Sequence, residues 1–139
     1  MLYDPTTPFG ARVERRLREE EVIWLTTVRR DGTPQPNPVW FVWNGETLLI
    51  YTLPDSFKVR NIRRSPRVSL HFDSGVNGED VVVFTGTASL DENAPTAQEN
   101  PAYLEKYGED IVRIGLTPKS MSASYSVAIR VKPEKVRGF

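Results

Sequence analysis

Two tight-turn signals divide the first third of the chain and limit what it can fold into. Asp31-Gly32 and Asn44-Gly45 are dipeptides typical of hairpin turns, in which both central positions favour a positive φ. The segments beside these turns, residues 23–28, 35–43 and 46–52, are rich in β-branched and aromatic side chains. The pattern predicts three strands joined by tight turns, and therefore a mostly antiparallel sheet.

The remaining chain predicts three more strands and several helices. Val68, Leu70 and Phe72 alternate with polar residues, so we expect these three side chains to face inward from a fourth strand. Gly86 is expected to bend or bulge the strand that follows. We expect these strands at residues 67–73, 80–90 and 125–131, the last ending before Pro133. Helices are expected at residues 11–21, in the short segment that Ser65-Pro66 ends, from Pro101 onward and for one turn after Thr117. The predicted fold class is mainly β: one domain over residues 1–139, with a mostly antiparallel sheet that closes into a small barrel flanked by helices.

Pro36 and Pro38 interrupt the start of the second predicted strand. Because proline cannot donate to a β-ladder, this part of the strand is expected at a sheet edge or a bulge, with backbone groups around Gln35, Asn37 and Val39 free for a ligand. The continuation, residues 39–43, is apolar on both faces. Its second face must therefore meet a helix, a flat aromatic ligand or another subunit.

Residues 51–66 combine the end of a strand, a Pro-Asp-Ser turn and a short basic helix. Asp55 or Ser56 is the expected N-cap, and Ser65-Pro66 ends the helix. Lys58 then falls in the first helical turn, where the helix dipole disfavours a cation unless an anion binds there too. Free N–H groups and Lys58 would together suit a phosphate. The alternative is a solvent-exposed basic turn.

Several classes of chemistry are excluded by composition. The chain has no Cys and a single His, His71, so neither a nucleophilic triad nor a metal-ligand cluster is visible. Lys plus Arg and Asp plus Glu both number 18, which gives no field favouring nucleic acid or an anionic membrane. No signal peptide or membrane-spanning run is visible, and we expect a cytoplasmic protein. Chemistry supplied by a bound cofactor remains, since it requires no catalytic side chain from the protein.

Three parts of the sequence resemble the pyridoxamine 5'-phosphate oxidase-like split β-barrel family. The first comprises Trp-Leu-Thr-Thr at residues 24–27, Asp-Gly-Thr-Pro-Gln at 31–35 and Pro-Val-Trp-Phe at 38–41. The second is the segment from Tyr51 through Lys-Val-Arg-Asn-Ile-Arg-Arg-Ser-Pro at 58–66, and the third is residues 80–88, which end in Gly-Thr-Ala. Within the family, the chain looks closest to the flavin/deazaflavin oxidoreductases that use coenzyme F420.

The resemblance implies an FMN-binding-like split barrel that forms a homodimer, with two cofactor sites in the dimer cleft. It assigns the cofactor phosphate to Lys58 and Ser56, supported by Asn61 and Thr52. The residues implied to line the cofactor ring are Gln35, Asn37, Pro38, Val39 and Trp40. Ser56-Phe57-Lys58 stands where true pyridoxamine phosphate oxidases have an adjacent Arg-Lys pair, so vitamin synthesis is not expected.

Three functional hypotheses stay open. The first is an oxidoreductase that uses coenzyme F420 to transfer a hydride to or from a small organic substrate. The second keeps the fold and uses FMN instead. The third is a non-catalytic protein that binds a flavin, a haem or another planar ligand. No metal, nucleic acid or membrane partner is expected, and the sequence identifies neither the substrate nor a catalytic residue.

Overall fold

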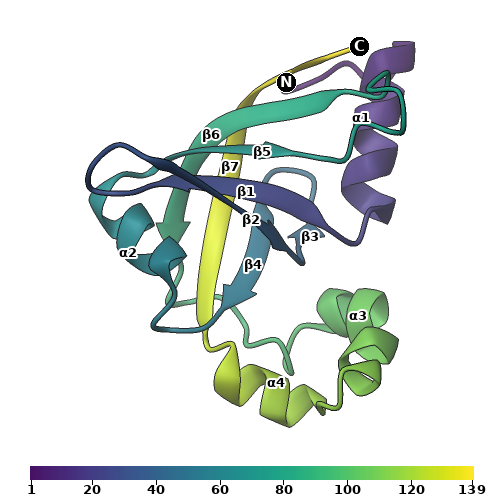
Figure 1. Cartoon of the computed structure of the whole chain (residues 1–139). Helices are drawn as coiled ribbons and strands as arrows, with labels where there is room; N and C mark the ends of the chain where they lie inside the picture. Colours follow the sequence, from purple (N-terminus) through teal and green to yellow (C-terminus); the bar gives the residue numbers. More distant parts are fainter.

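Seven strands form one antiparallel sheet that curls into a half-barrel with helices at its flanks (Figure 1). The computed structural model describes all residues, 1–139. The strand order is β2-β1-β5-β6-β7-β4-β3, which leaves β2 and β3 at the two edges. The elements are α1 Pro8–Glu19, β1 Ile23–Val28, β2 Pro34–Val39, β3 Val42–Trp43, β4 Leu48–Thr52, α2 Phe57–Arg64, β5 Arg67–His71, β6 Val82–Leu90, α3 Pro101–Arg113, α4 Pro118–Ser124 and β7 Val127–Gly138. The predicted class, mainly β and mostly antiparallel with flanking helices, is confirmed.

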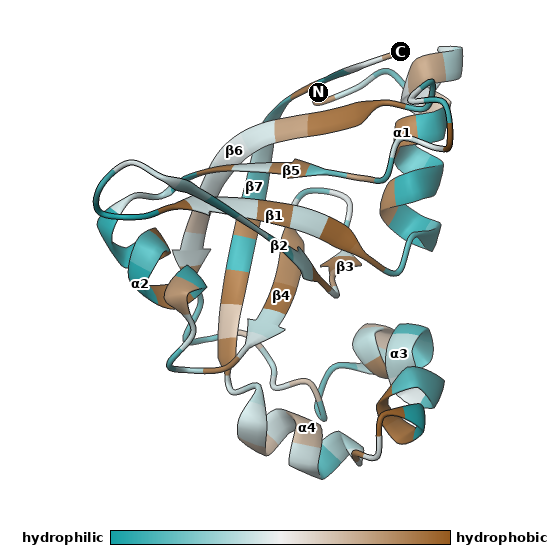
Figure 2. Ribbon diagram, viewed as in Figure 1, coloured by the Kyte–Doolittle hydropathy of each residue, from teal (hydrophilic) through white to brown (hydrophobic).

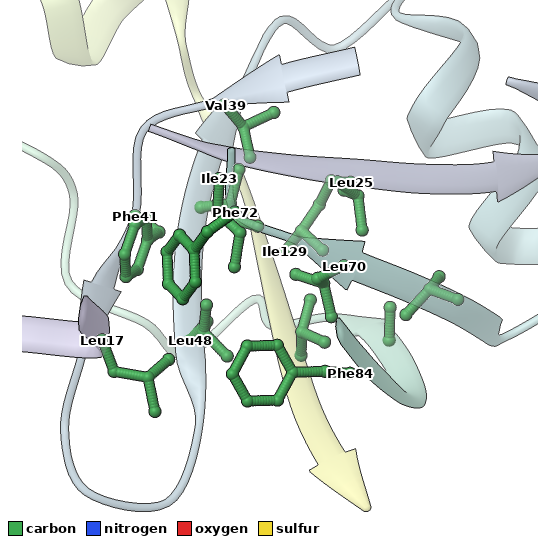
Figure 3. Packing of buried hydrophobic residues seen from close by; sticks show 14 of the residues in the cluster. Leu17, Ile23, Leu25, Val39, Phe41, Leu48, Leu70, Phe72, Phe84 and Ile129 are labelled. Carbon is green, nitrogen blue, oxygen red and sulfur yellow. The ribbon is translucent and has the colours of Figure 1, made fainter. Parts of the chain in front are cut away.

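The concave face of the sheet holds the main hydrophobic core. Val68, Leu70 and Phe72 point into it as the alternation predicted, each with at most 6% of its surface exposed. Phe72 packs between Phe41 and Phe84, with ring centroids 6.0 Å from each (Figure 3). Helix α1 adds Val13 and Leu17 to this cluster and covers one end of the curled sheet.

The second hairpin arm is broken where one strand was expected. Residues 35–43 divide into β2 and β3, because the chain leaves the ladder at Trp40 and Phe41. The Phe41 N–H donates to the Tyr107 hydroxyl of α3 at 2.9 Å in place of a neighbouring strand. The break depends on a partner 66 residues away in the chain, which local pattern does not show. Strand β2 itself lies at the edge, as its prolines predicted.

Strand β7 is longer than expected and runs through Pro133 to Gly138. Pro133 lies opposite Gly86 at a register shift between Thr85 and Gly86, so the bulge predicted at Gly86 is confirmed. A bulge relaxes the ladder, and the missing N–H of a proline is tolerated there. A Cβ at Gly86 would lie 2.1 Å from the Lys132 carbonyl oxygen, so glycine permits this close approach.

Helix boundaries follow the caps more than the apolar spacing. Helix α1 begins at Pro8 because Thr7 accepts a hydrogen bond from the Gly10 N–H, and it ends before Val22, which is 41% exposed. The single turn expected after Thr117 is a full helix, α4, fixed by a capping box between Thr117 and Ser120. Asn100 caps α3 as predicted, and none of the four helices combines the length and apolarity that crossing a membrane requires.

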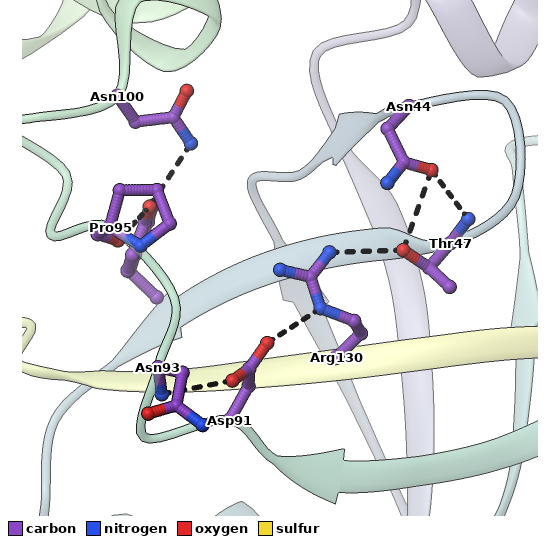
Figure 4. A network of polar contacts seen from close by, with 8 residues as sticks. Asn44, Thr47, Asp91, Asn93, Pro95, Asn100 and Arg130 are labelled. Carbon is purple, nitrogen blue, oxygen red and sulfur yellow. Dashed lines mark hydrogen bonds and ion pairs between the residues drawn. The ribbon is translucent and has the colours of Figure 1, made fainter.

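A second hydrophobic cluster lies between the outer face of β4 and β7 and the helices α3 and α4. It explains the two-sided apolar strand: Trp40 and Val42 meet a helix. Figure 2 shows apolar colour on β4, whereas α1 and α2 are largely hydrophilic. Arg130 of β7 donates to Asp91 at 2.8 Å and to Thr47 at 3.0 Å, which fixes the connection leading to α3 (Figure 4).

Candidate functional site

A cavity of about 340 Å³ lies between the sheet and helices α3 and α4. Strands β2 and β4 and the first turn of α2 supply its polar and flat walls, and α3, α4 and the residues next to them supply the opposite wall. Its lining residues are Asn37, Pro38, Val39, Trp40, Tyr51, Thr52, Leu53, Ser56, Lys58, Tyr103, Ile114, Met121 and Tyr125. Seven of the nine residues assigned to a cofactor site from the sequence are among them. Gln35 and Asn61 are not.

Lys58 contributes a cation without an anionic partner to this cavity. The residue is only 9% exposed, and its ammonium donates to Asn37 Oδ1 at 2.8 Å. The ammonium forms no salt bridge with any carboxylate of the chain. Burial lowers the pKa of Lys58, because the charged form loses hydration that a neutral amide replaces only partly. An anion in the cavity would supply the missing countercharge.

The first turn of α2 has backbone donors to offer beside Lys58. Ser56 is the N-cap, yet its side chain bonds no helix amide and instead accepts from Thr52 Oγ1 at 3.3 Å. The N–H groups of Phe57 and Lys58 donate to no acceptor within the chain. Free amides at a helix N-terminus favour anions, and here they coincide with an unpaired cation.

Asn61 and Gln35 lie behind this wall and bond to each other. Asn61 Nδ2 donates to Gln35 Oε1 and to Thr27 Oγ1, both at 2.9 Å, while Arg64 donates to Asn61 Oδ1 at 3.1 Å. This network ties α2 to the β1–β2 hairpin. Cofactor contacts by Asn61 and Gln35 stay predictions, and the role that the structure gives them is to hold α2 in place.

The free backbone expected at Gln35, Asn37 and Val39 is displaced by one residue. Arg29 N–H donates to Thr33 O at 2.9 Å, so the hydrogen-bonded pairs of this ladder continue through Gln35, Asn37 and Val39. Their N–H groups therefore point toward β1. The backbone groups of the prolines between them face the open edge. Trp40, two residues after Pro38, continues this alternation, so its backbone N–H also faces away from β1. Its N–H has no acceptor in the chain, so the free donor beside the cavity belongs to Trp40.

Stacked aromatic rings form the apolar wall. Trp40 stacks on Tyr107 with centroids 4.6 Å apart and planes 3° from parallel. Tyr103 meets Tyr51 edge-on at 4.9 Å, and burial raises the pKa of both tyrosines. Tyr103 was not among the residues predicted for the cofactor site. It packs and also lines the cavity, and its position opposite β4 is set by the fold and not by any local motif.

His71, the single histidine of the chain, is outside the cavity. Its ring stacks on Trp24 of β1, with centroids 6.1 Å apart. No group of three or more His, Asp or Glu side chains is placed to hold a metal ion. The cavity therefore offers one cation, several hydroxyl and amide groups, free backbone donors and a flat aromatic surface. Such a set can bind a planar ligand that bears an anionic group.

Comparison with known proteins gives a family match and similar structures. The model of the family described as pyridoxamine 5'-phosphate oxidase matches residues 9–139. A structure described as an F420 reductase is 28% identical, with a TM-score of 0.66, over 89% of this chain and 94% of that chain. No match is found among curated proteins.

Two further structures share the fold at lower identity. The conserved hypothetical protein Rv2991 from Mycobacterium tuberculosis is 24% identical, with a TM-score of 0.73, over 91% of this chain and 81% of that chain. HutZ, the haem storage protein from Vibrio cholerae, is 18% identical, with a TM-score of 0.65, over 95% of each chain. At these identities the likeness extends to the fold alone.

Proposed function

Because the chain belongs to the pyridoxamine 5'-phosphate oxidase family, whose model spans residues 9–139, we propose that its cavity binds a flavin-type cofactor. The proposed cofactor is coenzyme F420, and the proposed activity is hydride transfer between this deazaflavin and a small organic substrate. The choice of F420 over FMN is supported by the 28% identical structure described as an F420 reductase. Both cofactors carry a phosphate and a flat ring, so the cavity suits either.

The observation on which the proposal depends is the unpaired ammonium of Lys58. A charge-assisted hydrogen bond to a phosphate contributes on the order of 1.5–3 kcal/mol. Ser56 and the free amides of Phe57 and Lys58 would add donors around the same anion. Thr52 would support this end through its bond to Ser56. Two or three such bonds are enough for micromolar binding when a ring is buried as well.

The ring of the cofactor would lie against Pro38, Val39 and Trp40, the apolar side of the cavity. Trp40 presents a flat surface whose tilt is fixed by its stacking on Tyr107, and its free N–H would bond a polar ring edge. When bound, a reduced deazaflavin supplies the hydride. The chain orients the ring and keeps water away from it, so no acid or base side chain is required for this step.

A second copy of the chain would complete the site. Leu53 and Ile114 line the cavity yet are 45% and 55% exposed, so the cavity has an apolar rim that nothing in this chain covers. We propose a homodimer in which the partner covers this rim, in agreement with what the family resemblance implied. Because each of these residues is already about half buried, covering the rest of each side chain contributes on the order of 1 kcal/mol.

The experiment that tests the proposal is a side-by-side titration of the purified protein with coenzyme F420 and FMN. We expect F420 to bind in the micromolar range or tighter, and more tightly than FMN. Tighter binding of FMN would make FMN the proposed cofactor and leave the proposed site unchanged. Absence of binding by both would reject the proposal. Reduced F420 mixed with menadione, a general hydride acceptor, then separates an enzyme from a carrier, because a carrier does not accelerate the reoxidation.

A further inference from the structure

Helix α3 holds the strand break at Trp40 and Phe41 through two consecutive residues. The Tyr107 hydroxyl accepts the Phe41 N–H at 2.9 Å and lies 2.9 Å from the Phe41 carbonyl and 2.7 Å from the Glu21 carbonyl. The Lys106 ammonium donates to the same Phe41 carbonyl at 2.9 Å. A hydroxyl has one proton, so Tyr107 can donate to only one of the two carbonyls. Because Lys106 donates to the Phe41 carbonyl, Tyr107 can donate to the Glu21 carbonyl. Both residues are needed to satisfy both carbonyls.

Lys106 is half-buried, lies beside two aromatic rings and forms no salt bridge. Its ammonium lies 3.8 Å from the Phe41 ring centroid and 5.3 Å from that of Tyr107. Glu20 and Glu21, in the connection between α1 and β1, are the charged groups that face it, and both favour its protonated form. Burial outweighs them and lowers the pKa of Lys106 to about 8.

The same contacts determine where the aromatic wall of the cavity lies. Trp40 precedes Phe41 in the chain and stacks on Tyr107, so both its backbone and its ring are positioned by α3. Lys106 does not line the cavity and would not touch a ligand there. A change at Lys106 can therefore reach the cavity only through Phe41, Tyr107 and Trp40.

We propose that Lys106 is a positioning residue that latches helix α3 to the strand break and so holds Trp40 against the cofactor cavity. The part of this inference that concerns the cofactor rests on the proposed function. The latch itself, by which we mean the hydrogen bonds of Lys106 and Tyr107 to the Phe41 backbone, is a property of this chain alone. It can be measured without a ligand.

The direction of its pH dependence follows from burial. Protonated Lys106 is better solvated when it leaves the latch for water, whereas the neutral amine stays and still donates to Phe41. The latch therefore tightens as the pH rises through about 8. Lys58 has the opposite effect on anion binding, because its ammonium loses charge as the pH rises.

The test without ligand is fluorine NMR of protein labelled with 5-fluorotryptophan. The chain has three Trp residues, and the Trp40 resonance is identified by its loss in Trp40→Phe. We expect this resonance to move with pH in the wild type. Lys106→Met, which has no donor, should shift it toward the low-pH position at every pH. Lys106→Arg keeps a donor and stacks on Phe41 but does not titrate, so the movement should disappear. Lys135→Met, at an exposed lysine, is the matched control.

Two outcomes overturn the latch: a Trp40 resonance that titrates identically in Lys106→Arg, or one that Lys106→Met leaves unchanged. The ligand test compares the F420 affinities of Lys106→Met and the wild type at pH 7 and pH 9, which cancels the effect of Lys58. We expect at least about threefold weaker binding in Lys106→Met at pH 9, because the hydrogen bond to Phe41 is lost, and a smaller ratio at pH 7. Equal ratios at both values contradict the latch. If the wild type binds neither cofactor, the proposed function fails, and the NMR result alone decides on the latch.

Discussion

Lys58 shows how a single residue can indicate a ligand. A cation in the first turn of a helix is disfavoured by the dipole, and burial disfavours it further, so two independent effects oppose its charge. Asn37 supplies a hydrogen bond but no countercharge. A bound phosphate would reverse both effects at once.

At this scale we predict that Lys58→Ala weakens cofactor binding at least about tenfold, equivalent to ~1.4 kcal/mol. The reason is the loss of the only ammonium that lines the cavity. The affinity is measured by titration with F420, and circular dichroism checks that the variant is folded. Lys135→Ala, at an exposed position in β7, should bind like the wild type. An unchanged affinity in Lys58→Ala would remove this residue from the site.

The sequence predicted the residues of this wall better than their contacts. Ser56 is the N-cap of α2 and Lys58 lies in its first turn, as expected, because a Pro-Asp-Ser turn and a proline stop define the helix locally. The bond between Asn61 and Gln35 joins residues 26 apart in the chain, and it leaves both outside the cavity lining. Side chains that satisfy each other across two elements look, in sequence, the same as side chains that await a ligand.

At the scale of elements, local signals located most boundaries, and long-range contacts determined the exceptions. Turn dipeptides, caps and alternation predicted both hairpins, the N-cap of α3 and the face of β5. The break between β2 and β3 required Tyr107, and the passage of β7 through Pro133 required the bulge opposite it. Such partners become visible only when distant strands and helices are assembled.

The bulge gives a prediction about stability. Gly86→Ala should destabilise the fold by about 1–3 kcal/mol, because the new Cβ would meet the Lys132 backbone at 2.1 Å and the strands must separate. Urea unfolding measures the change. Gly108→Ala is the matched control, since its Cβ meets nothing within 4 Å and alanine favours the interior of α3. That variant should gain about 0.5–1 kcal/mol. Equal stabilities for the two variants would contradict the close approach at the bulge.

At the scale of the whole molecule, the cavity is shaped by two layers of different origin. The sheet side and the first turn of α2 supply the polar groups, and α3 and α4 add an aromatic and apolar cover. The sequence indicated the first layer through its motifs. The second contains Tyr103, Met121 and Tyr125, which belong to no motif and were not among the predicted site residues.

The uncovered rim leads to a prediction about assembly. We expect a dimer by size-exclusion chromatography with light scattering, and a shift toward monomer in the double variant Leu53→Glu with Ile114→Glu, because carboxylates at the rim oppose burial. Cofactor affinity should fall with the dimer. Val112→Glu, at an apolar residue that is 67% exposed but does not line the cavity, should remain dimeric. A monomeric wild type at micromolar concentration would contradict the proposed assembly.

The prolines at the edge of β2 affect how prone the chain is to aggregate during folding. The backbone groups of Pro34, Pro36 and Pro38 face the open edge of the strand. They offer carbonyl oxygens there but no N–H groups. A neighbouring chain cannot extend the ladder along such an edge, because every second bond lacks its donor. While the protein is synthesised and its sheet is still incomplete, this strand is therefore protected from joining other chains into cross-β aggregates.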